Sequence, residues 1–295
     1  TRRRLVQTSI QLAALSPFFR ASAQLLAAED SPKRKILFFT KSQTFEHSVI
    51  RSEGGAPSYA GRMLLEFAGA AGFEFDETKD GSVFDGDLDQ YDAFFFYTTG
   101  DLTKPGTDQS TPMSERGKEN LLKAIAKGKG MFGSHCASDP FHSPGPAFEN
   151  QAQPDPFIKM LGGEFIRHGR QQEARMRVVS PQFPGLAPAR DGFNLHEEWY
   201  SLKNFTDDIH VMLVQETKGM DGHDYDRPDF PATWARQEEE GRVFYTSMGH
   251  REDVWANPIF QSIVVGGLQW ITRQVNADIS PNMQQVTPEA LKLPG

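Results

Sequence analysis

Short apolar runs alternate with amphipathic segments along most of the chain. The segment 35–40 carries a continuous apolar run that is followed by a polar loop, which is typical of a strand buried on both faces. Further short strands are predicted at 73–75, 91–97 and 131–133, and helices with one apolar face begin near Ser58 and Ser114. The two kinds of segment therefore follow one another in the order strand, helix, strand.

The same pattern returns near the C-terminus. A strand is predicted at 241–247, and a long helix begins at Pro258 with Asn257 as its N-cap. The region from about 138 to 229 is less regular, and we interpret it as an elaboration of the same sheet. This succession predicts an α/β fold, a doubly wound and mostly parallel sheet with helices on both faces.

The first residues have the three parts of an export signal. A basic start is followed by an apolar middle and by small residues at Ala21 and Ala23, and the paired arginines Arg3 and Arg4 indicate the twin-arginine route. A basic amphipathic helix that stays on the protein is the alternative. We expect a periplasmic or secreted protein with a signal peptide at 1–23, a linker at 24–34, the α/β domain at 35–275 and a polar C-terminal tail at 276–295.

Composition excludes several classes of protein. The 295 residues are 38% hydrophobic and 24% charged, which is typical of a globular chain, and the formal net charge is −8. No basic stripe follows the first residues, so we expect no nucleic-acid partner. We also expect no membrane span in the mature protein, because no other stretch approaches the roughly 20 apolar residues that a span needs. Cys136 is the only cysteine, so a metal site would have to use histidine and carboxylate.

Three histidines follow the carboxyl ends of predicted strands. His47 lies in the loop after the first strand, His135 follows the strand at 131–133, and His250 follows the strand at 241–247. Ligands of an open parallel sheet bind just beyond these ends, so we expect the three imidazoles to meet in one crevice. Imidazoles with a carboxylate would suit a divalent metal ion, zinc or a similar one.

Two further groups could carry chemistry. Glu197 and Glu198 stand next to two aromatic residues, where a buried carboxylate would have a raised pKa and could act as a general base; a solvated acidic pair is the alternative. Cys136 could be a nucleophile at the turn after a buried strand. His135 holds the position that such a turn exposes, however, so a buried structural thiol is the commoner role for Cys136.

Several short motifs, taken together and in order, identify a family resemblance. The chain from about 35 to 273 resembles the ThuA-like (trehalose-utilisation) family in these motifs: His47, Gly133-Ser134-His135, Leu161-Gly162-Gly163-Glu164-Phe165 with His168, Glu197-Glu198-Trp199-Tyr200, Pro231-Ala232-Thr233-Trp234, Gly241-Arg242-Val243-Phe244-Tyr245-Thr246 and Gly249-His250. The chain departs from the family's usual Asp-Glu-x-Tyr by carrying Glu197 in the Asp position, which leaves Glu198 as the transferred residue. The loop 103–114 is also longer than usual.

The resemblance implies a class I glutamine amidotransferase-like, or flavodoxin-like, fold in which histidine replaces the nucleophilic cysteine. It also implies sugar metabolism, in particular the processing of disaccharides and glycosides that a sugar 3-dehydrogenase, the functional partner, has oxidised to 3-keto forms. The small-molecule substrate would then be a sugar. Aromatic faces stack on the C–H faces of pyranoses, so the expected sugar-facing groups are Trp199, Tyr200 and Trp234 together with His168; core packing is the alternative for the three aromatics.

These expectations combine into an enzyme hypothesis, a carbon–oxygen lyase or glycoside hydrolase acting on oxidised sugars. A divalent ion held by His47, His135 and His250 would stabilise charge on the C3 oxygen, while Glu198 or a histidine, His135 or His250, removes the C2 proton and the C1 substituent leaves. Elimination, hydrolysis and isomerisation all remain open. The rival hypotheses are a non-catalytic periplasmic carbohydrate-binding protein and a hydrolase that depends on Cys136.

Overall fold

The computed structural model describes residues 33–52 and 54–295. The predicted signal peptide at 1–23 and the linker up to residue 32 lie outside the described residues. Export by the twin-arginine route therefore stays a prediction.

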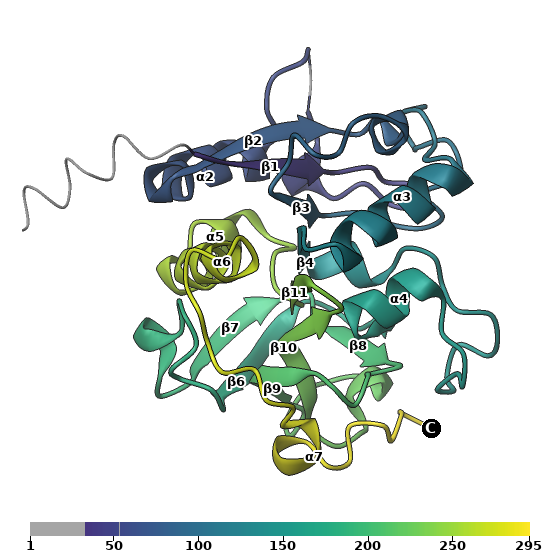
Figure 1. The fold of residues 1–295 in the computed structure, drawn as a ribbon. Helices are drawn as coiled ribbons and strands as arrows, with labels where there is room; N and C mark the ends of the chain where they lie inside the picture. The colour runs from purple at the N-terminus through teal and green to yellow at the C-terminus, as the bar shows by residue number, and fades with distance from the viewer. Residues whose placement is uncertain (1–32, 53) are drawn as a thin grey trace, which may run out of the picture. The chain divides into compact units, whose positions relative to one another are not determined.

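Five neighbouring strands form the parallel half of a nine-stranded sheet (Figure 1). In spatial order they are β2 (Phe73–Thr78), β1 (Arg34–Phe39), β3 (Ala93–Phe96), β4 (Gly130–Ser134) and β11 (Gly241–Thr246). The apolar residues of β1 and β3 are fully buried, as expected for strands that are covered on both faces. This arrangement confirms the predicted doubly wound α/β fold, and the strand order is the flavodoxin-like one.

Helices cover both faces of this parallel half (Figure 1). On one face lie α2 (Tyr59–Phe67), α5 (Glu252–Trp255) and α6 (Pro258–Ile271), and on the other lie α3 (Glu115–Ala126) and α4 (Pro156–Leu161). Asn257 caps α6 as predicted, because its side chain accepts a hydrogen bond from the N–H of Ile259. The structure therefore places α2 and α6 where the apolar periodicity predicted helices.

The other four strands continue the sheet in antiparallel directions. They are β10 (Phe230–Glu238), β9 (His210–Glu216), β6 (Gln172–Val178) and β7 (Phe193–Glu197). The middle of the chain thus extends the same sheet, as predicted, but the sheet is mixed because a tight turn joins β10 to β11 and loops, rather than helical crossovers, join β6 to β7 and β9 to β10. A separate two-stranded sheet pairs β5 (Glu164–His168) with β8 (Tyr200–Lys203).

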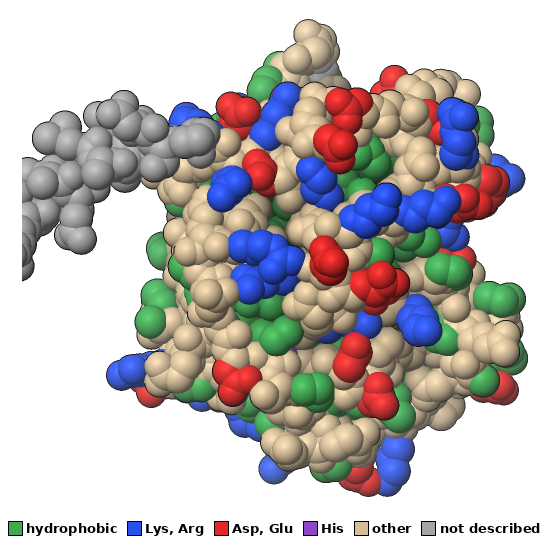
Figure 2. Space-filling view, in the orientation of Figure 1, with side chains coloured by type: hydrophobic (Ala, Val, Ile, Leu, Met, Phe, Trp, Pro, Cys, Tyr) green, Lys and Arg blue, Asp and Glu red, His purple; other side chains and the backbone are tan. Residues whose placement is uncertain are grey.

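The C-terminal tail packs beside β9. It contains the short helix α7 (Met283–Val286), whose Met283 is buried, and the side chain of Asn282 bonds the backbone of Val211 in both directions. On the face shown in Figure 2, Lys and Arg side chains lie intermingled with Asp and Glu. Among residues 33–52 and 54–295, no helix combines the length and the apolar character that a membrane crossing requires.

Candidate functional site

Three histidines and one glutamate from distant parts of the chain meet at one point. Potential ligand atoms of His47, His135, Glu198 and His250 all lie within 4.8 Å of one another. The ring centroid of His47 lies 5.0 Å from those of His135 and His250, which are 5.2 Å apart. The structure therefore brings together the three imidazoles that follow the strand ends, and it adds the carboxylate of Glu198.

His135 and His250 are neighbours because β4 and β11 are adjacent parallel strands. His135 directly follows β4 with a φ of 48°, an uncommon conformation for a residue that has a Cβ. Its carbonyl accepts a hydrogen bond from the hydroxyl of Tyr245 at 2.8 Å. His250 follows Gly249, whose φ of 128° favours glycine. Both turns are therefore held in special conformations that place the two rings side by side.

His47 reaches the same point from the loop after β1, immediately before the 3₁₀ helix Ser48–Ile50. β1 and β3 are parallel neighbours, and the direction in which successive strands are added to the sheet reverses between them, which is where flavodoxin-like sheets bind ligands. Tyr97, directly after β3, packs its ring 5.4 Å from that of His47. The Nδ1 atom of His47 is buried and has no hydrogen-bond partner among residues 33–52 and 54–295. Because burying an unpaired polar atom costs free energy, this nitrogen is suited to binding an ion or a ligand.

Glu197 ties two segments of the site together. Its fully buried carboxylate accepts hydrogen bonds from the backbone N–H groups of Glu198 at 2.7 Å, Gly249 at 3.0 Å and His250 at 3.1 Å. Burial raises the pKa of Glu197 to about 7, although these hydrogen bonds act in the opposite direction. The connection between β7 and β8 is thereby fastened to the turn after β11, and this places Glu198 beside the histidines.

The carboxylate of Glu198 contacts three imidazoles. Its Oε2 lies 3.0 Å from His250 Nδ1 and 3.5 Å from His135 Nε2, and its Oε1 lies 3.4 Å from His168 Nδ1. Burial acts to raise the pKa of Glu198, but hydrogen bonds with His135 and His250 outweigh it and hold the pKa well below its usual range. Burial likewise acts to lower the pKa of His250, and the contact with Glu198 raises it overall. Glu198 is therefore an anion at neutral pH, and the raised pKa that the sequence predicted for a buried carboxylate here belongs to Glu197 instead.

His47 and His135 are in the neutral form that binds metal ions. Burial lowers the pKa of both rings, and for His47 the nearby His135 and His250 add to this effect. His135 Nδ1 donates to the carbonyl of Ser247 at 3.0 Å, so the lone pair lies on Nε2, which faces the cluster. A backbone carbonyl on the far nitrogen is a common feature of histidine ligands.

Gln171 was missed by the sequence analysis. Its Nε2 lies 2.9 Å from His250 Nε2, and its Oε1 accepts a hydrogen bond from Arg251 at 2.6 Å. It thereby contacts the ring nitrogen of His250 that is turned away from Glu198. His168 stands three residues before Gln171, and this short spacing is the one signal in the sequence; only the folded antiparallel half reveals the contact with His250.

A cavity of about 310 Å³ lies against the cluster, and we call it the histidine cavity. Its lining residues are His47, Glu198, His168 and Tyr200, which the sequence analysis selected, and Thr44, Phe45, Thr99, Asp139 and Phe165, which it did not. Phe45 is 60% exposed and Phe165 is partly buried, so both offer aromatic surface to a ligand. Phe45 stands two residues before His47, and this short spacing is the signal that could have found it.

Trp199 and Trp234 lie elsewhere, in the core. Both side chains are fully buried. The indole N–H of Trp199 donates to the carbonyl of Gln172 at 3.0 Å, and that of Trp234 donates to the carbonyl of Leu161 at 2.9 Å. Neither lines the histidine cavity, so these two residues have the core-packing role that was the alternative for them, whereas Tyr200 lines the cavity.

Cys136 is fully buried beside the site. Burial raises the pKa of its thiol well above the usual value, so the thiol stays protonated at neutral pH. A nucleophilic cysteine needs the thiolate and access to a substrate. The surroundings of Cys136 are therefore those of a structural thiol.

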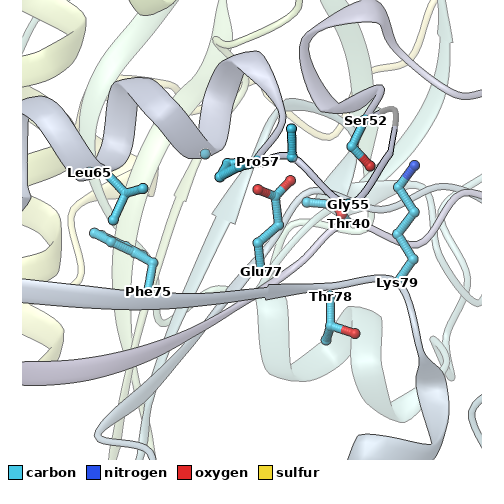
Figure 3. Close-up of a pocket in the computed structure, with 11 residues that line it drawn as sticks. Thr40, Ser52, Gly55, Pro57, Leu65, Phe75, Glu77, Thr78 and Lys79 are labelled. Carbon is cyan, nitrogen blue, oxygen red and sulfur yellow. The ribbon is translucent and has the colours of Figure 1, made fainter.

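A separate cavity of about 420 Å³ lies between α2 and β2 (Figure 3). Glu77 and Lys79 are its charged lining residues. Glu77 accepts a hydrogen bond from the N–H of Ser58, and Lys79 forms ion pairs with Glu46 and Asp108. The histidine cavity is the stronger candidate for chemistry because it adjoins the cluster of imidazoles and a carboxylate.

Solved structures of other proteins share this fold. A ThuA-like protein from Bacteroides uniformis is 19% identical with a TM-score of 0.58, over 82% of this chain and 92% of that chain. A ThuA-like protein from Parabacteroides merdae is 16% identical with a TM-score of 0.54, over 84% and 93%. A cytoplasmic protein from Salmonella typhimurium is 15% identical with a TM-score of 0.50, over 80% and 98%. No curated protein matches the sequence.

The fold and the histidine cavity define a flavodoxin-like α/β protein with a cluster of potential ligands at its strand ends. The family model described as Trehalose utilisation (ThuA) matches residues 35–271. The chain therefore belongs to the ThuA family, and the resemblance found in the sequence is confirmed.

Proposed function

We propose that this protein is a metal-dependent enzyme that cleaves 3-keto-glycosides by removing the C2 proton and expelling the C1 substituent. The observation that carries the proposal is the cluster of His47, His135, Glu198 and His250 beside a cavity of ligand size. Membership of a family described by trehalose utilisation supports a sugar as the substrate.

The residues present fit a divalent ion. His47, His135 and His250 offer imidazole nitrogens and Glu198 offers a carboxylate oxygen, a donor set that suits zinc and similar first-row ions. The unpartnered Nδ1 of His47 and the orientation of the His135 ring support this fit. When bound, such an ion would supply a Lewis acid that stabilises negative charge on a ketone oxygen.

The Oε1 atom of Glu198 accepts the C2 proton in this proposal, and Oε2, on the side of His135 and His250, would be the oxygen available to the ion. Glu198 is ionised at neutral pH, it lines the histidine cavity, and its Oε1 lies beside His168. The electron pair left on C2 is delocalised onto the C3 oxygen and then forms the C1–C2 double bond as the C1–O bond breaks. The departing oxygen takes up a proton from the Glu198–His168 pair, so protons and electrons balance. Addition of water to the double bond afterwards converts the elimination into net hydrolysis.

The remaining parts of the proposal follow from this reaction. A 3-keto sugar must be produced by oxidation of a C3 hydroxyl, so a sugar 3-dehydrogenase is the functional partner. Export to the periplasm by the N-terminal signal belongs to the same proposal. It rests on the basic start and the small residues near position 23.

Metal removal and replacement test the proposal. We expect purified protein to contain about one equivalent of zinc or a similar ion, and chelation to lower turnover of 3-ketotrehalose by about 100-fold or more, with recovery on adding the ion back. The His47→Ala variant should behave like the chelated protein. The His223→Ala variant is the control, because His223 is exposed and bonds to Asp226 away from the cluster.

Two outcomes would count against the proposal. Full activity after complete metal removal would contradict metal assistance. Saturable sugar binding without turnover in the metal-loaded protein would favour the carbohydrate-binding alternative instead.

A further inference from the structure

A second cavity, of about 490 Å³, lies next to the histidine cavity, and we call it the outer cavity. Thr44 lines both cavities. The outer cavity is otherwise lined by polar and charged residues and one aromatic residue: Gln43, Gly100, Asp101, Thr103, Glu115, Lys118, Phe141, His142 and Asp155.

Two chain segments run from one cavity to the other. In the segment 43–45, Gln43 lines the outer cavity and Phe45 lines the histidine cavity. In the segment 99–101, Thr99 lines the histidine cavity and Asp101 lines the outer cavity. The two segments are bonded to each other, since the N–H of Gln43 donates to the carbonyl of Thr99 at 2.9 Å and the N–H of Asp101 donates to Gln43 Oε1 at 3.1 Å. They form a shared wall.

A third segment makes the same connection. Asp139 lines the histidine cavity, and its Oδ1 lies 2.9 Å from Nε2 of His142, which lines the outer cavity. The other oxygen of Asp139 accepts a hydrogen bond from the N–H of Gly100 at 2.7 Å. Three separate segments therefore border both cavities, which indicates one cleft with two compartments.

The outer cavity offers hydrogen-bonding groups of both kinds. Lys118 pairs with Asp155 at 2.8 Å, and Asp101 accepts a hydrogen bond from Thr103. These carboxylates and that of Glu115 can accept further hydrogen bonds, and the ammonium group of Lys118 has further hydrogens to donate. Hydrogen bonds to Asp139 and Glu164 raise the pKa of His142 to about 9, so its ring is a cation at neutral pH. Three carboxylates against two cations do not favour an anionic ligand, whereas mixed donors and acceptors suit a neutral ligand with several hydroxyl groups.

We propose that the outer cavity is a subsite for the sugar ring that leaves, so that the substrate is a disaccharide whose second ring is neutral and polyhydroxylated. This inference rests on the proposed function, because the histidine cavity must hold the ring that reacts. Each cavity lies near the lower end of the roughly 300–1,000 Å³ range of small-molecule sites, so a two-ring ligand uses both.

A pair of tryptophan substitutions on one helix tests the subsite. Glu115 is exposed at the start of α3 and lines the outer cavity, so Glu115→Trp fills that cavity without touching the histidine cavity. Glu119→Trp is the matched control, since Glu119 is exposed one turn further along α3 and pairs with Lys123. Both changes are on the surface, so both variants should melt within about 2 °C of wild type.

The readouts are equilibrium binding of trehalose and of methyl α-glucoside by calorimetry, and KM for their 3-keto forms. We expect Glu115→Trp to weaken binding and raise KM for the disaccharide by about tenfold or more, while the values for the methyl glycoside change less than about twofold. We expect Glu119→Trp to change neither. Replacing the second ring of the disaccharide by its phosphorylated form should not strengthen binding.

The possible failures are distinguishable. If Glu115→Trp affects the disaccharide and the methyl glycoside equally, or affects neither, the subsite is overturned while metal-dependent turnover by wild type leaves the proposed function standing. If wild type neither binds nor turns over any of these sugars, both proposals are overturned together.

Discussion

Protonation at the cluster is set by the immediate surroundings of each side chain. Burial keeps His47 and His135 neutral by lowering their pKa values, whereas the contacts of Glu198 with His135 and His250 keep it ionised by lowering its pKa. Metal ions bind the neutral form of histidine and the ionised form of a carboxylate. At neutral pH these three residues are therefore in the forms that a divalent ion requires, whereas Glu198 raises the pKa of His250, so an ion would compete with a proton there.

The buried thiol of Cys136 provides a first test at the residue scale. We expect Cys136→Ala to leave turnover within about twofold of wild type and to lower the free energy of unfolding by about 1 kcal/mol, because a buried sulfur is lost from the core. We also expect iodoacetamide not to label Cys136 in the folded protein. Activity assays, urea unfolding and mass spectrometry give the three values. Loss of activity in a folded variant would revive the cysteine hydrolase hypothesis.

His142 makes stability depend on pH. Asp139 and Glu164 raise the pKa of His142 from 6.5 to about 9, so its contribution to stability is complete below pH 6.5 and is lost as the pH rises through about 9. Half of the side chain is exposed, so solvent screening reduces the effect to about 1 kcal/mol. We expect the free energy of unfolding to fall between pH 6 and pH 10 by about 1 kcal/mol more in wild type than in His142→Gln. Urea unfolding of both proteins at the two pH values measures this difference. Equal losses in the two proteins would contradict the assignment.

At the scale of elements, the site is built from turns at strand ends rather than from the strands themselves. Tyr97 and Trp255 both donate hydrogen bonds to the carbonyl of Gly249, at 2.9 and 2.7 Å, and Ser134 donates to the carbonyl of Met248 at 2.8 Å. The turn after β11 is thus bonded to the ends of β3 and β4. Its rigidity is what fixes the direction of His250.

Gly249 tests this turn. An added Cβ would lie 2.7 Å from Ser134 Oγ, and φ is 128°, so we expect Gly249→Ala to cost about 2 kcal/mol of stability and to weaken zinc binding. Gly219→Ala is the control for backbone strain alone, because φ is 90° and no atom lies within 4 Å of the added Cβ. Thermal unfolding measures the loss of stability in each variant, and zinc titration measures the affinity, which we expect to fall in Gly249→Ala but not in Gly219→Ala. Wild-type zinc affinity in Gly249→Ala would show that the turn does not position His250.

Glu197 tests the link between the β7–β8 connection and the same turn. We expect Glu197→Gln to lose about 1–3 kcal/mol of stability, since an amide cannot accept all three N–H groups as the carboxylate does. Metal affinity should fall by about 10- to 100-fold, the usual effect of changing a group that orients ligands. Calorimetric zinc titration measures it, with the exposed Glu239→Gln as control. Unchanged affinity would mean that Glu198 is positioned by other contacts.

At the scale of the whole molecule, the cluster connects both halves of the sheet. His47, His135 and His250 follow strands of the parallel half, and Glu198 follows β7 at the far edge of the antiparallel half. A ligand that holds all four residues opposes unfolding of the entire unit 34–295. Binding and global stability are therefore coupled.

Zinc should accordingly stabilise the whole protein. At a free zinc concentration about 100 times the dissociation constant we expect about 2.7 kcal/mol of added stability, seen as a higher melting temperature. His47→Ala should abolish the increase, whereas His223→Ala should keep it, because His223 lies away from the cluster. Differential scanning calorimetry gives both values. If zinc does not change the melting temperature of wild type, the proposal that the cluster binds a metal ion is contradicted, whatever the activity assays show.

Much of this fold was predictable because its signals are local. The apolar runs of β1 and β3 and the cap at Asn257 depend on neighbouring residues only, and they were correctly predicted. The antiparallel directions of β10, β9, β6 and β7 were not predicted from local patterns, because strand direction depends on the connections and on pairing with distant strands. The convergence of three histidines could be inferred because parallel strands end at one edge.

The α/β class, the ThuA family and the three histidines at the strand ends could be inferred from the amino-acid order, because periodicity and residue type are encoded locally. Which neighbouring side chains face the cavity depends on how the folded segments pack. Trp199 entered the core while the adjacent Glu198 and Tyr200 line the cavity, since successive residues of an extended chain point to opposite sides. The contact of Gln171 with His250 and the outer cavity likewise depend on contacts between distant segments.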